Sequence, residues 1–519
     1  MTSEQIQILI AMCFYMAAVV LIGVFYSKRA NRSSEDYFLG GRSLGPWVTA
    51  MSAEASDMSG WLLMGLPGVA YWCGLADAAW TAIGLAVGTY VNWLLVSKRL
   101  RRYSVRTNSI TLPEFFSNRF REKKKVILSI SAVFILVFFT VYAASCFVTC
   151  GKLFSALFGA DYVVMMIIGA VFVVAYTLLG GFLAESISDF FQAIVMIVAL
   201  AVVVIVGTIN AGGIGAVIEN SQSIPGFLEF FGIASPEVVD GAQVVVDGVP
   251  QFGVAAEYGL LTVCSTLAWG LGYFGMPQVL LRFMAIRKEG ELKRSRRIAV
   301  VWVVISLAVA VFIGLIGRSL EPTAHLTSSA SENIFITLST SLLPTILAGF
   351  VMAGILAATM SSSDSYLLIA ASAFAKNLFQ GVCKKNATDK QVMLMSRITL
   401  LVLSVIGIII AIDENSVIFQ IVSFAWAGFG ATFGPLVLFS LFWKRINRAG
   451  AIAGMLSGGI TVFVWKLLLK PLGGVFGIYE LLPAFIVSCI FIVAVSLLTK
   501  KPSAEIEADF EAAKVGSDE

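Results

Sequence analysis

The stretch SAEASDMSGWLLMGLPG, residues Ser52–Gly68, decides the fold because it interrupts an otherwise apolar segment. It contains two acids, three serines, three glycines and a proline. A charged side chain at the centre of a bilayer costs at least about 2.5 kcal/mol. Glycine and proline also weaken the helix that must satisfy backbone hydrogen bonds in lipid. The stretch therefore predicts a membrane helix that is broken for a functional reason.

The composition indicates a membrane protein. Of the 519 residues, 58% are hydrophobic and 13% are charged, whereas about a quarter of the residues in soluble domains are charged. We therefore expect a polytopic protein whose main partner is the lipid bilayer. A net charge of +4 is too small to indicate a nucleic-acid partner. The first residues lack a basic segment and a cleavage site, so we interpret them as a first span rather than a signal peptide.

About thirteen apolar runs are long enough to cross a hydrocarbon core of about 30 Å. They lie near Ile8–Tyr26, Trp47–Cys73, Ala76–Val96, Val126–Leu157, Tyr162–Leu179, Phe190–Ile209, Leu260–Met276, Ile298–Ile316, Leu342–Ala375, Ile398–Ile412, Val417–Trp443, Ala451–Leu469 and Leu481–Leu498. The loops after the first, third, seventh, ninth and eleventh of these runs are rich in Lys and Arg, and the loop after the seventh begins with Arg282. The longest loop of the opposite side, Asn210–Tyr258, has neither residue. By the positive-inside rule, we expect a multi-pass protein of the cell (inner or plasma) membrane with its N-terminus outside and its C-terminus in the cytoplasm.

A second span is also interrupted, by AWGLGYFGMPQ at Ala268–Gln278. It lies five spans after the first break, so the two broken spans cross the membrane in opposite directions. Such a pair at matching positions of inverted halves is typical of a secondary transporter with a site at the midplane. We predict an all-α fold with inverted five-helix repeats over about 46–209 and 259–470. These repeats belong to a single transmembrane domain over 1–500, followed by a polar cytoplasmic tail over 501–519.

Oxygen-bearing residues at the first break predict a cation site. Asp57 can neutralise a cation or cap a half-helix, while Ser59 and Gly60 offer a hydroxyl and an unhindered backbone. Hydroxyls of Ser361 and Ser362 in the ninth span can share a face toward the break. Serines in membrane helices also bond their own helix, which is the alternative interpretation. A hard cation such as Na⁺ is bound by such oxygens.

Aromatic side chains flank both breaks: Trp61 beside the first, Trp269 and Tyr273 at the second, and Tyr142 in the fourth span. Aromatic rings with polar tips can hold a small ring and a cation. Ordinary packing, or a position in an interfacial belt, is the alternative.

Three acids have no obvious place in a span. Glu54 lies one turn before Asp57, so the two carboxylates repel unless a cation or a proton separates them. Glu54 is therefore protonated, faces the cytoplasmic vestibule, or pairs with a basic group such as Arg42. Glu185 and Asp189 lie in the predicted link GGFLAESISDFF, either as solvated loop acids or as a station for a departing cation.

The sequence does not predict an enzyme. The seven cysteines have no metal-binding or disulfide spacing, and His325 is the one histidine. No nucleophile with a neighbouring base is evident.

Three strings resemble the proline branch of the sodium/solute symporter family: YFLGGRSLGPWVTAMSAEASDMSGWLLMGLPG, WGLGYFGMPQVLLRFMA and FAWAGFGATFGPLVLF. The similarity runs over nearly the whole chain. It implies a LeuT-like fold with thirteen spans and Na⁺-coupled uptake of L-proline by alternating access, with Na⁺ as the coupling ion. We expect the protein to function as a monomer.

The resemblance also implies residue roles. The Na⁺ site would use the carbonyl groups of Ala55, Met58 and Ala358, the hydroxyls of Ser361 and Ser362, and the acids Asp57 and Asp189, the latter on the cytoplasmic ion path. The proline pocket would contain Ser59, Gly60, Trp61, Tyr142, Trp269, Tyr273 and Pro277. Arg42 matches a basic residue near the inner gate, where we also place Glu54.

Two departures from the branch stand out. Where its members have SAGASDMSG, this chain has Glu54 in place of a glycine. Where they have MSTLS, this chain has MSSSD, so Ser362 replaces a threonine and Asp364 a serine. The added acids leave Na⁺ or H⁺ open as the coupling ion. Another small amino or carboxylic acid as substrate, or a sensor-type membrane domain, are the alternative functions.

Overall fold

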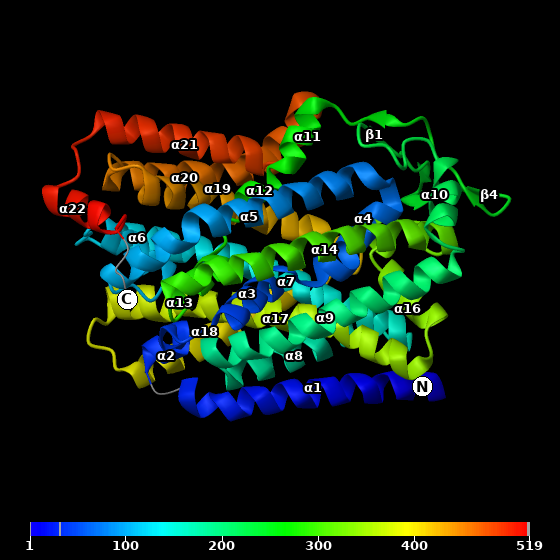
Figure 1. The fold of residues 1–519 in the computed structure, drawn as a ribbon, viewed down its shortest axis with the longest axis horizontal. Coiled ribbons are helices and arrows are strands. Elements are labelled where there is room, and N and C mark those ends of the chain that lie inside the picture. The colour runs from blue at the N-terminus through cyan, green and yellow to red at the C-terminus, as the bar shows by residue number, and fades with distance from the viewer. Residues whose placement is uncertain (1, 31–32, 516–519) are drawn as a thin grey trace.

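The computed structural model describes residues 2–30 and 33–515 as a long bundle of helices (Figure 1). The N-terminus lies at one end of the bundle and the C-terminal tail at the other. We call the end formed by residues 98–125, 286–297, 443–448 and 499–515 the basic face. The opposite end, formed by residues 211–259, 321–344, 411–417 and 473–480, is called the hairpin face. Successive spans run between these two faces.

Ten helices in the described part of the chain are long and apolar enough to cross a membrane. They contain α1 (Ser3–Ala30), α5 (Leu75–Arg106), α7 (Val126–Phe158), α9 (Phe182–Asn210), α14 (Leu292–Leu320), α17 (Thr345–Ser372), α18 (Asp389–Ile410), α19 (Ile418–Phe442), α20 (Arg448–Val464) and α21 (Leu481–Leu498). Two of them continue as π-helical turns, α17 into η4 (Ala373–Cys383) and α20 into η5 (Trp465–Leu469). Their apolar faces leave many large hydrophobic side chains exposed on the outside of the bundle, as a lipid-facing surface requires.

Three further crossings are built from shorter helices. The second span consists of α3 (Pro46–Asp57), the π-helical turn η2 (Trp61–Gly65) and α4 (Leu66–Cys73). The fifth is α8 (Tyr162–Leu179), and the seventh consists of α11 (Leu260–Leu267), α12 (Trp269–Gly272) and α13 (Pro277–Ala285). With the ten long helices they make thirteen crossings among the described residues, and both predicted breaks are confirmed.

Short elements join the spans at both faces. On the basic face these are α2 (Ser34–Leu39), η1 (Gly40–Arg42), α6 (Leu112–Arg119), η3 (Glu289–Glu291) and the tail helix α22 (Ala504–Ala512). On the hairpin face they are α10 (Ile214–Gln222), α15 (Ser328–Ser331), α16 (Ile334–Leu342), η6 (Lys470–Leu472) and η7 (Gly474–Gly477). The predicted polar tail thus contains a docked helix, and its last four residues, 516–519, lie outside the described part.

One loop departs from the predicted all-α class because it contains short β-strands. Between α10 and α11, six two-residue strands pair antiparallel: β1 (Gly232–Ile233) with β6 (Ala256–Glu257), β2 (Val238–Val239) with β3 (Ala242–Gln243), and β4 (Val245–Val246) with β5 (Val249–Pro250). Pairs this short carry no alternation of apolar and polar residues over several positions, which is the usual sequence signal of a strand.

Several helices extend beyond the predicted span boundaries, and at two of these boundaries charged residues move from a predicted loop into the bundle. The sixth span begins at Phe182 rather than Phe190, and the seventh continues to Ala285 rather than ending at Met276. Glu185 and Asp189 are therefore helical and buried, and so is Arg282. Hydropathy assigns isolated charges to loops, but these charges lie inside the bundle because they pair with one another.

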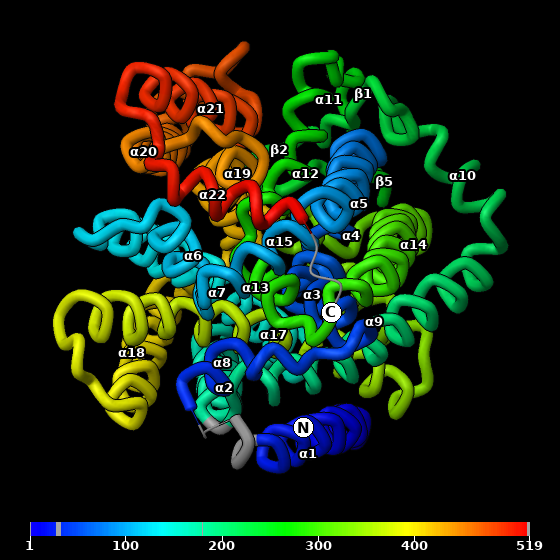
Figure 2. The backbone as a smooth tube through the Cα atoms, turned by 60° about the vertical axis from the view of Figure 1, so that its left-hand side comes forward, coloured from blue at the N-terminus to red at the C-terminus, as the bar shows by residue number. Residues whose placement is uncertain are grey.

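Small residues allow the broken spans to pack closely in the middle of the bundle. A Cβ atom on Gly88 of α5 would lie 2.3 Å from the carbonyl oxygen of Gly270 in α12, so only glycine permits this approach. Seen from another direction (Figure 2), α3 lies in the interior, while α1, α18 and α21 lie at the periphery. The first break is thus surrounded by protein rather than lipid.

Candidate ion and substrate site

The first break frees backbone groups at the end of α3. Met58 leaves the helical region with φ −84° and ψ 74°, and a new helical turn starts at Trp61. The indole Nε1 of Trp61 donates to the carbonyl oxygen of Asp57 over 3.1 Å. A Cβ on Gly60 would lie 2.3 Å from the Thr149 hydroxyl of α7, so this glycine lets the break approach α7.

Four of the atoms predicted to bind Na⁺ lie together. The Ser361 hydroxyl lies 2.8 Å from the carbonyl oxygen of Ala55 and 3.2 Å from that of Ala358. The Ser362 hydroxyl lies 3.3 Å from the Ala55 oxygen. All of these residues are buried. The arrangement joins α3 to α17 through oxygens alone, which is the chemistry that a hard cation prefers. We call these four residues the oxygen cluster.

Asp57 lies at a different point of the break. Its Oδ2 accepts a hydrogen bond of 2.7 Å from the Tyr273 hydroxyl, whereas Oδ1 has no partner among the described residues. Because Tyr273 follows α12 directly, this bond joins the two broken spans. None of the hydrogen bonds of the Asp57 side chain goes to Ser361 or Ser362.

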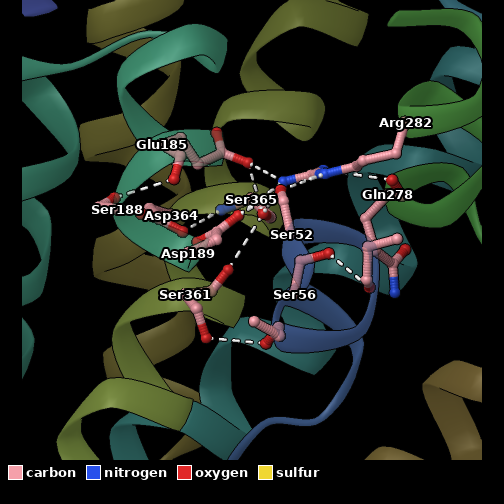
Figure 3. A network of polar contacts seen from close by, with 12 residues as sticks. Ser52, Ser56, Glu185, Ser188, Asp189, Gln278, Arg282, Ser361, Asp364 and Ser365 are labelled. Carbon is pink, nitrogen blue, oxygen red and sulfur yellow. Dashed lines mark hydrogen bonds and ion pairs between the residues drawn. The ribbon is translucent and has the colours of Figure 1, made fainter. Parts of the chain in front are cut away.

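Asp189 belongs to a buried polar network (Figure 3), which we call the arginine network. Arg282 of α13 has no exposed surface, and its Nη2 lies 2.5 Å from Glu185 Oε1 and 3.1 Å from Asp189 Oδ2. The Ser52 hydroxyl of α3 donates to Asp189 Oδ2 over 2.7 Å and accepts from Arg282 Nε over 3.0 Å. The interpretation of Glu185 and Asp189 as solvated loop acids is therefore wrong.

The arginine network touches the oxygen cluster through α17. The Ser365 hydroxyl accepts a hydrogen bond of 2.8 Å from Arg282 and lies 3.1 Å from the carbonyl oxygen of Ser361. The neighbouring Asp364 is 2% exposed, and its Oδ2 has no partner in the described chain. The arginine network and the oxygen cluster thus contact α17 at positions one helical turn apart.

The predicted substrate residues divide between two depths. Tyr142 is buried and stacks on Tyr366 with ring centroids 4.2 Å apart, and Ser59 and Trp61 are buried near the break. Trp269 lies nearer the hairpin face, stacked on Tyr479 at 5.0 Å.

Trp269 also lines a cavity of about 550 Å³ together with residues of the hairpin face such as Tyr258 and Glu332.

Pro277 starts α13, and a proline at the first turn of a helix is favoured because its missing N–H needs no partner there.

Arg42 lies on the basic face and ties several segments together. Its guanidinium donates to the carbonyl oxygens of Met284 and Ser109, each over 2.7 Å, and to the Ser104 hydroxyl over 3.2 Å. Burial lowers the pKa of the Arg42 guanidinium to about 10. Because the guanidinium is bonded to these three groups and not to Glu54, the interpretation that Glu54 pairs with Arg42 is wrong.

Glu54 is 1% exposed, so it does not face an open vestibule either. Its Oε1 accepts a hydrogen bond of 3.1 Å from Trp93 Nε1 of α5. Of the three interpretations of Glu54, the protonated carboxyl is left; a cation between Glu54 and Asp57 would also remove their repulsion.

Comparison with known proteins identifies the family. The model of the sodium:solute symporter family matches residues 37–458. The chain belongs to the sodium:solute symporter family. It is a Na⁺-coupled solute symporter and a multi-pass membrane protein, not an enzyme.

Several relatives are close in sequence. The chain is 41% identical over 510 residues to sodium/proline symporters of Staphylococcus aureus strains USA300 and NCTC 8325, covering 97% of this chain and 95% of theirs. Among solved structures, a Na⁺-coupled sialic acid symporter in a substrate-bound, outward-open state matches with a TM-score of 0.75 at 18% identity, over 96% of this chain and 99% of that one. The nucleobase-cation-symport-1 transporter Mhp1 in a closed conformation matches with a TM-score of 0.51 at 12% identity, over 92% of this chain and 98% of that one. The predicted LeuT-like fold is confirmed.

Sequence reasoning missed Arg282 and Trp93 as partners of buried acids. One signal was available, because Glu185 and Asp189 are four residues apart and share a helix face. Their partner follows the second break directly in PQVLLRFMA.

Proposed function

We propose that this symporter couples inward Na⁺ movement to the uptake of L-proline by alternating access. The name of its relatives, 41% identical over nearly the whole chain, supports proline as the substrate. The oxygen cluster is the observation that carries the coupling. It lies at the same break as Trp61 and one helical turn from Tyr366, on which Tyr142 stacks.

Na⁺ is held by the carbonyl groups of Ala55, Met58 and Ala358 with the hydroxyls of Ser361 and Ser362. The ion replaces the hydrogen bonds that now join α3 to α17, and so fixes the broken helix. Because linkage is reciprocal, Na⁺ raises the affinity for proline by the same factor by which proline raises the affinity for Na⁺. Asp57 stabilises the cation at longer range, and Asp189 lies on its path to the basic face.

The substrate pocket is formed by Ser59, Gly60, Trp61, Tyr142, Trp269, Tyr273 and Pro277. The proline carboxylate is bound by backbone N–H groups where the second half-helix begins, because a helix N-terminus is positive. The ring and the secondary ammonium lie against the aromatic side chains. Arg42 and Glu54 belong to the inner gate.

The orientation follows from the charges. Lys and Arg concentrate on the basic face, so this face is cytoplasmic, the N-terminus is outside and the tail is inside. We assign residues 1–500 to one transmembrane domain that works as a monomer in the cell membrane.

Uptake of labelled proline into proteoliposomes tests the proposal with Na⁺, Li⁺ and H⁺ gradients applied separately. We expect the Na⁺ gradient to drive uptake that unlabelled proline abolishes and that sugars and other carboxylic acids leave unchanged. Uptake driven by H⁺ alone, or competition by another amino acid at lower concentration than proline, would contradict it.

Ser361→Ala and Ser362→Ala test the ion site. We expect each to raise the Na⁺ concentration at half-maximal uptake at least about tenfold, since one ligand is lost. Ser363→Ala is the matched control, because the Ser363 hydroxyl bonds Thr359 of its own helix over 2.6 Å. Equal effects at all three positions would refute the assignment.

A further inference from the structure

Glu54 and Asp57 lie three residues apart on one side of α3, next to α5 and the second break. Trp93 of α5 donates to Glu54, and Tyr273 donates to Asp57. On α5, Asn92 Nδ2 donates to the carbonyl oxygen of Tyr273 over 3.0 Å. Three different spans therefore meet around the two carboxyl groups.

Three side-chain oxygens in this region have no hydrogen-bond partner among the described residues: Glu54 Oε2, Asp57 Oδ1 and Asn92 Oδ1. The residues that bear them are at most 1% exposed. The Thr89 hydroxyl is also buried and lies within hydrogen-bonding reach of the Tyr273 hydroxyl, which in turn contacts Asp57. An unpaired buried polar group costs about 1–3 kcal/mol, so three of them in one region of the bundle indicate a ligand.

The charge of the region points to the kind of ligand. None of the ion pairs formed by the described residues includes Glu54 or Asp57. By contrast, Glu185 and Asp189 in the arginine network share the Arg282 guanidinium. Two neighbouring buried carboxylates without a counter-ion repel each other unless a cation or a proton lies between them. Carboxylate, amide and hydroxyl oxygens are the ligands that hard cations take.

We propose that Glu54, Asp57, Thr89 and Asn92 form a second Na⁺ site, separate from the oxygen cluster. The inference rests on the proposed function in that it assumes Na⁺-driven transport. The two sites use different partners of α3: the oxygen cluster joins α3 to α17, and the second site joins α3 to α5. Because Tyr273 contacts Asp57, the second ion also acts on the other broken span.

The site has a consequence for coupling. The chain moves about two Na⁺ per proline, and its uptake depends on Na⁺ concentration with a Hill coefficient above one, since two bound ions promote the same state. Glu54 is the residue that completes the site, because it supplies the second carboxylate.

The experiment measures ²²Na⁺ and labelled proline flux in the same proteoliposomes, and equilibrium ²²Na⁺ binding to the purified protein. We expect about two bound Na⁺ per chain for the wild type and about one for Glu54→Gln, with a Hill coefficient that falls toward one. Thr89→Val is expected to weaken the second binding step about tenfold while leaving the first unchanged. Ser97→Ala is the control on α5, since its hydroxyl bonds Trp93 of its own helix over 2.7 Å.

Several outcomes would overturn the site. One outcome is a single bound Na⁺ in the wild type, and another is an unchanged number of bound Na⁺ ions in Glu54→Gln. A third is that Glu54→Gln loses the pH dependence of proline uptake with no change in Na⁺ binding, which would assign a shared proton instead. If Glu54→Gln does not survive gel filtration, Thr89→Val alone decides. The binding measurement needs no transport, so a wild type that binds two Na⁺ without moving proline would overturn the proposed function and keep the site.

Discussion

Replacing Arg282 by glutamine tests whether the arginine network holds the bundle together. The Arg282 side chain is fully buried and donates hydrogen bonds to Glu185, Asp189, Ser52 and other partners. Removing one partner of a buried ion pair costs about 3–5 kcal/mol because the other charge stays buried without compensation. We therefore expect Arg282→Gln to lower the free energy of unfolding by about this amount, with a clear loss of thermal stability in detergent.

Two comparisons make the test specific. Arg287→Gln removes an arginine whose side chain is 54% exposed and paired with Glu291 four residues on, so it is expected to cost under about 0.5 kcal/mol. The double variant Glu185→Gln with Arg282→Gln removes both charges of the closest pair and is expected to recover part of the loss. Additive losses in the double variant, or equal effects of Arg282→Gln and Arg287→Gln, would refute the reasoning.

Three further predictions follow from single contacts. Gly88→Ala forces its Cβ against the Gly270 backbone and is expected to cost about 1–3 kcal/mol; an unchanged unfolding temperature would contradict the packing. Tyr273→Phe removes the donor to Asp57 and is expected to raise the Na⁺ concentration at half-maximal uptake, so an unchanged Na⁺ dependence would exclude a role for this bond. Burial lowers the pKa of His325, in the loop after α14, from 6.5 to about 4. The folded state therefore favours neutral His325. The stability that the protein has above pH 6.5 falls as the pH is lowered toward 4, because the unfolded chain then binds a proton that the folded protein does not. Thermal unfolding of His325→Gln is expected to show a smaller loss of stability over this pH range.

The spans and both breaks were predictable because hydropathy and backbone chemistry are local signals. A run of apolar residues predicts a crossing, and glycine, proline and acids within it predict a break. The proximity of Ser361 to the first break was also predictable, since hydroxyls in a membrane helix face protein rather than lipid.

The partners of the buried acids were not predictable in the same way. Glu185 and Arg282 are 97 positions apart in the sequence, and each alone suggests a solvated loop. Trp93 gave no signal as the partner of Glu54, because an aromatic residue in an apolar span is ordinary. Pairing of distant charges depends on the packing of the spans, and no local pattern encodes it.

The ion pairs near the basic face are strongest in the interior of the protein and weaken toward its surface. Deepest is Arg282 with its two acids, where a lost partner is expensive. Outermost is α22, whose Asp509 pairs with Arg121, a side chain that is 47% exposed, and such a pair contributes at most about 1 kcal/mol. Opening the bundle toward the basic face would therefore cost little free energy at the tail helix and most of it where Ser52 contacts Asp189. These two residues lie between the oxygen cluster and the basic face, so a Na⁺ ion that leaves its ligands toward Asp189 competes with Arg282 for the same carboxylate. On the proposed ion path past Asp189, release of the ion and opening of the arginine network would be one event rather than two.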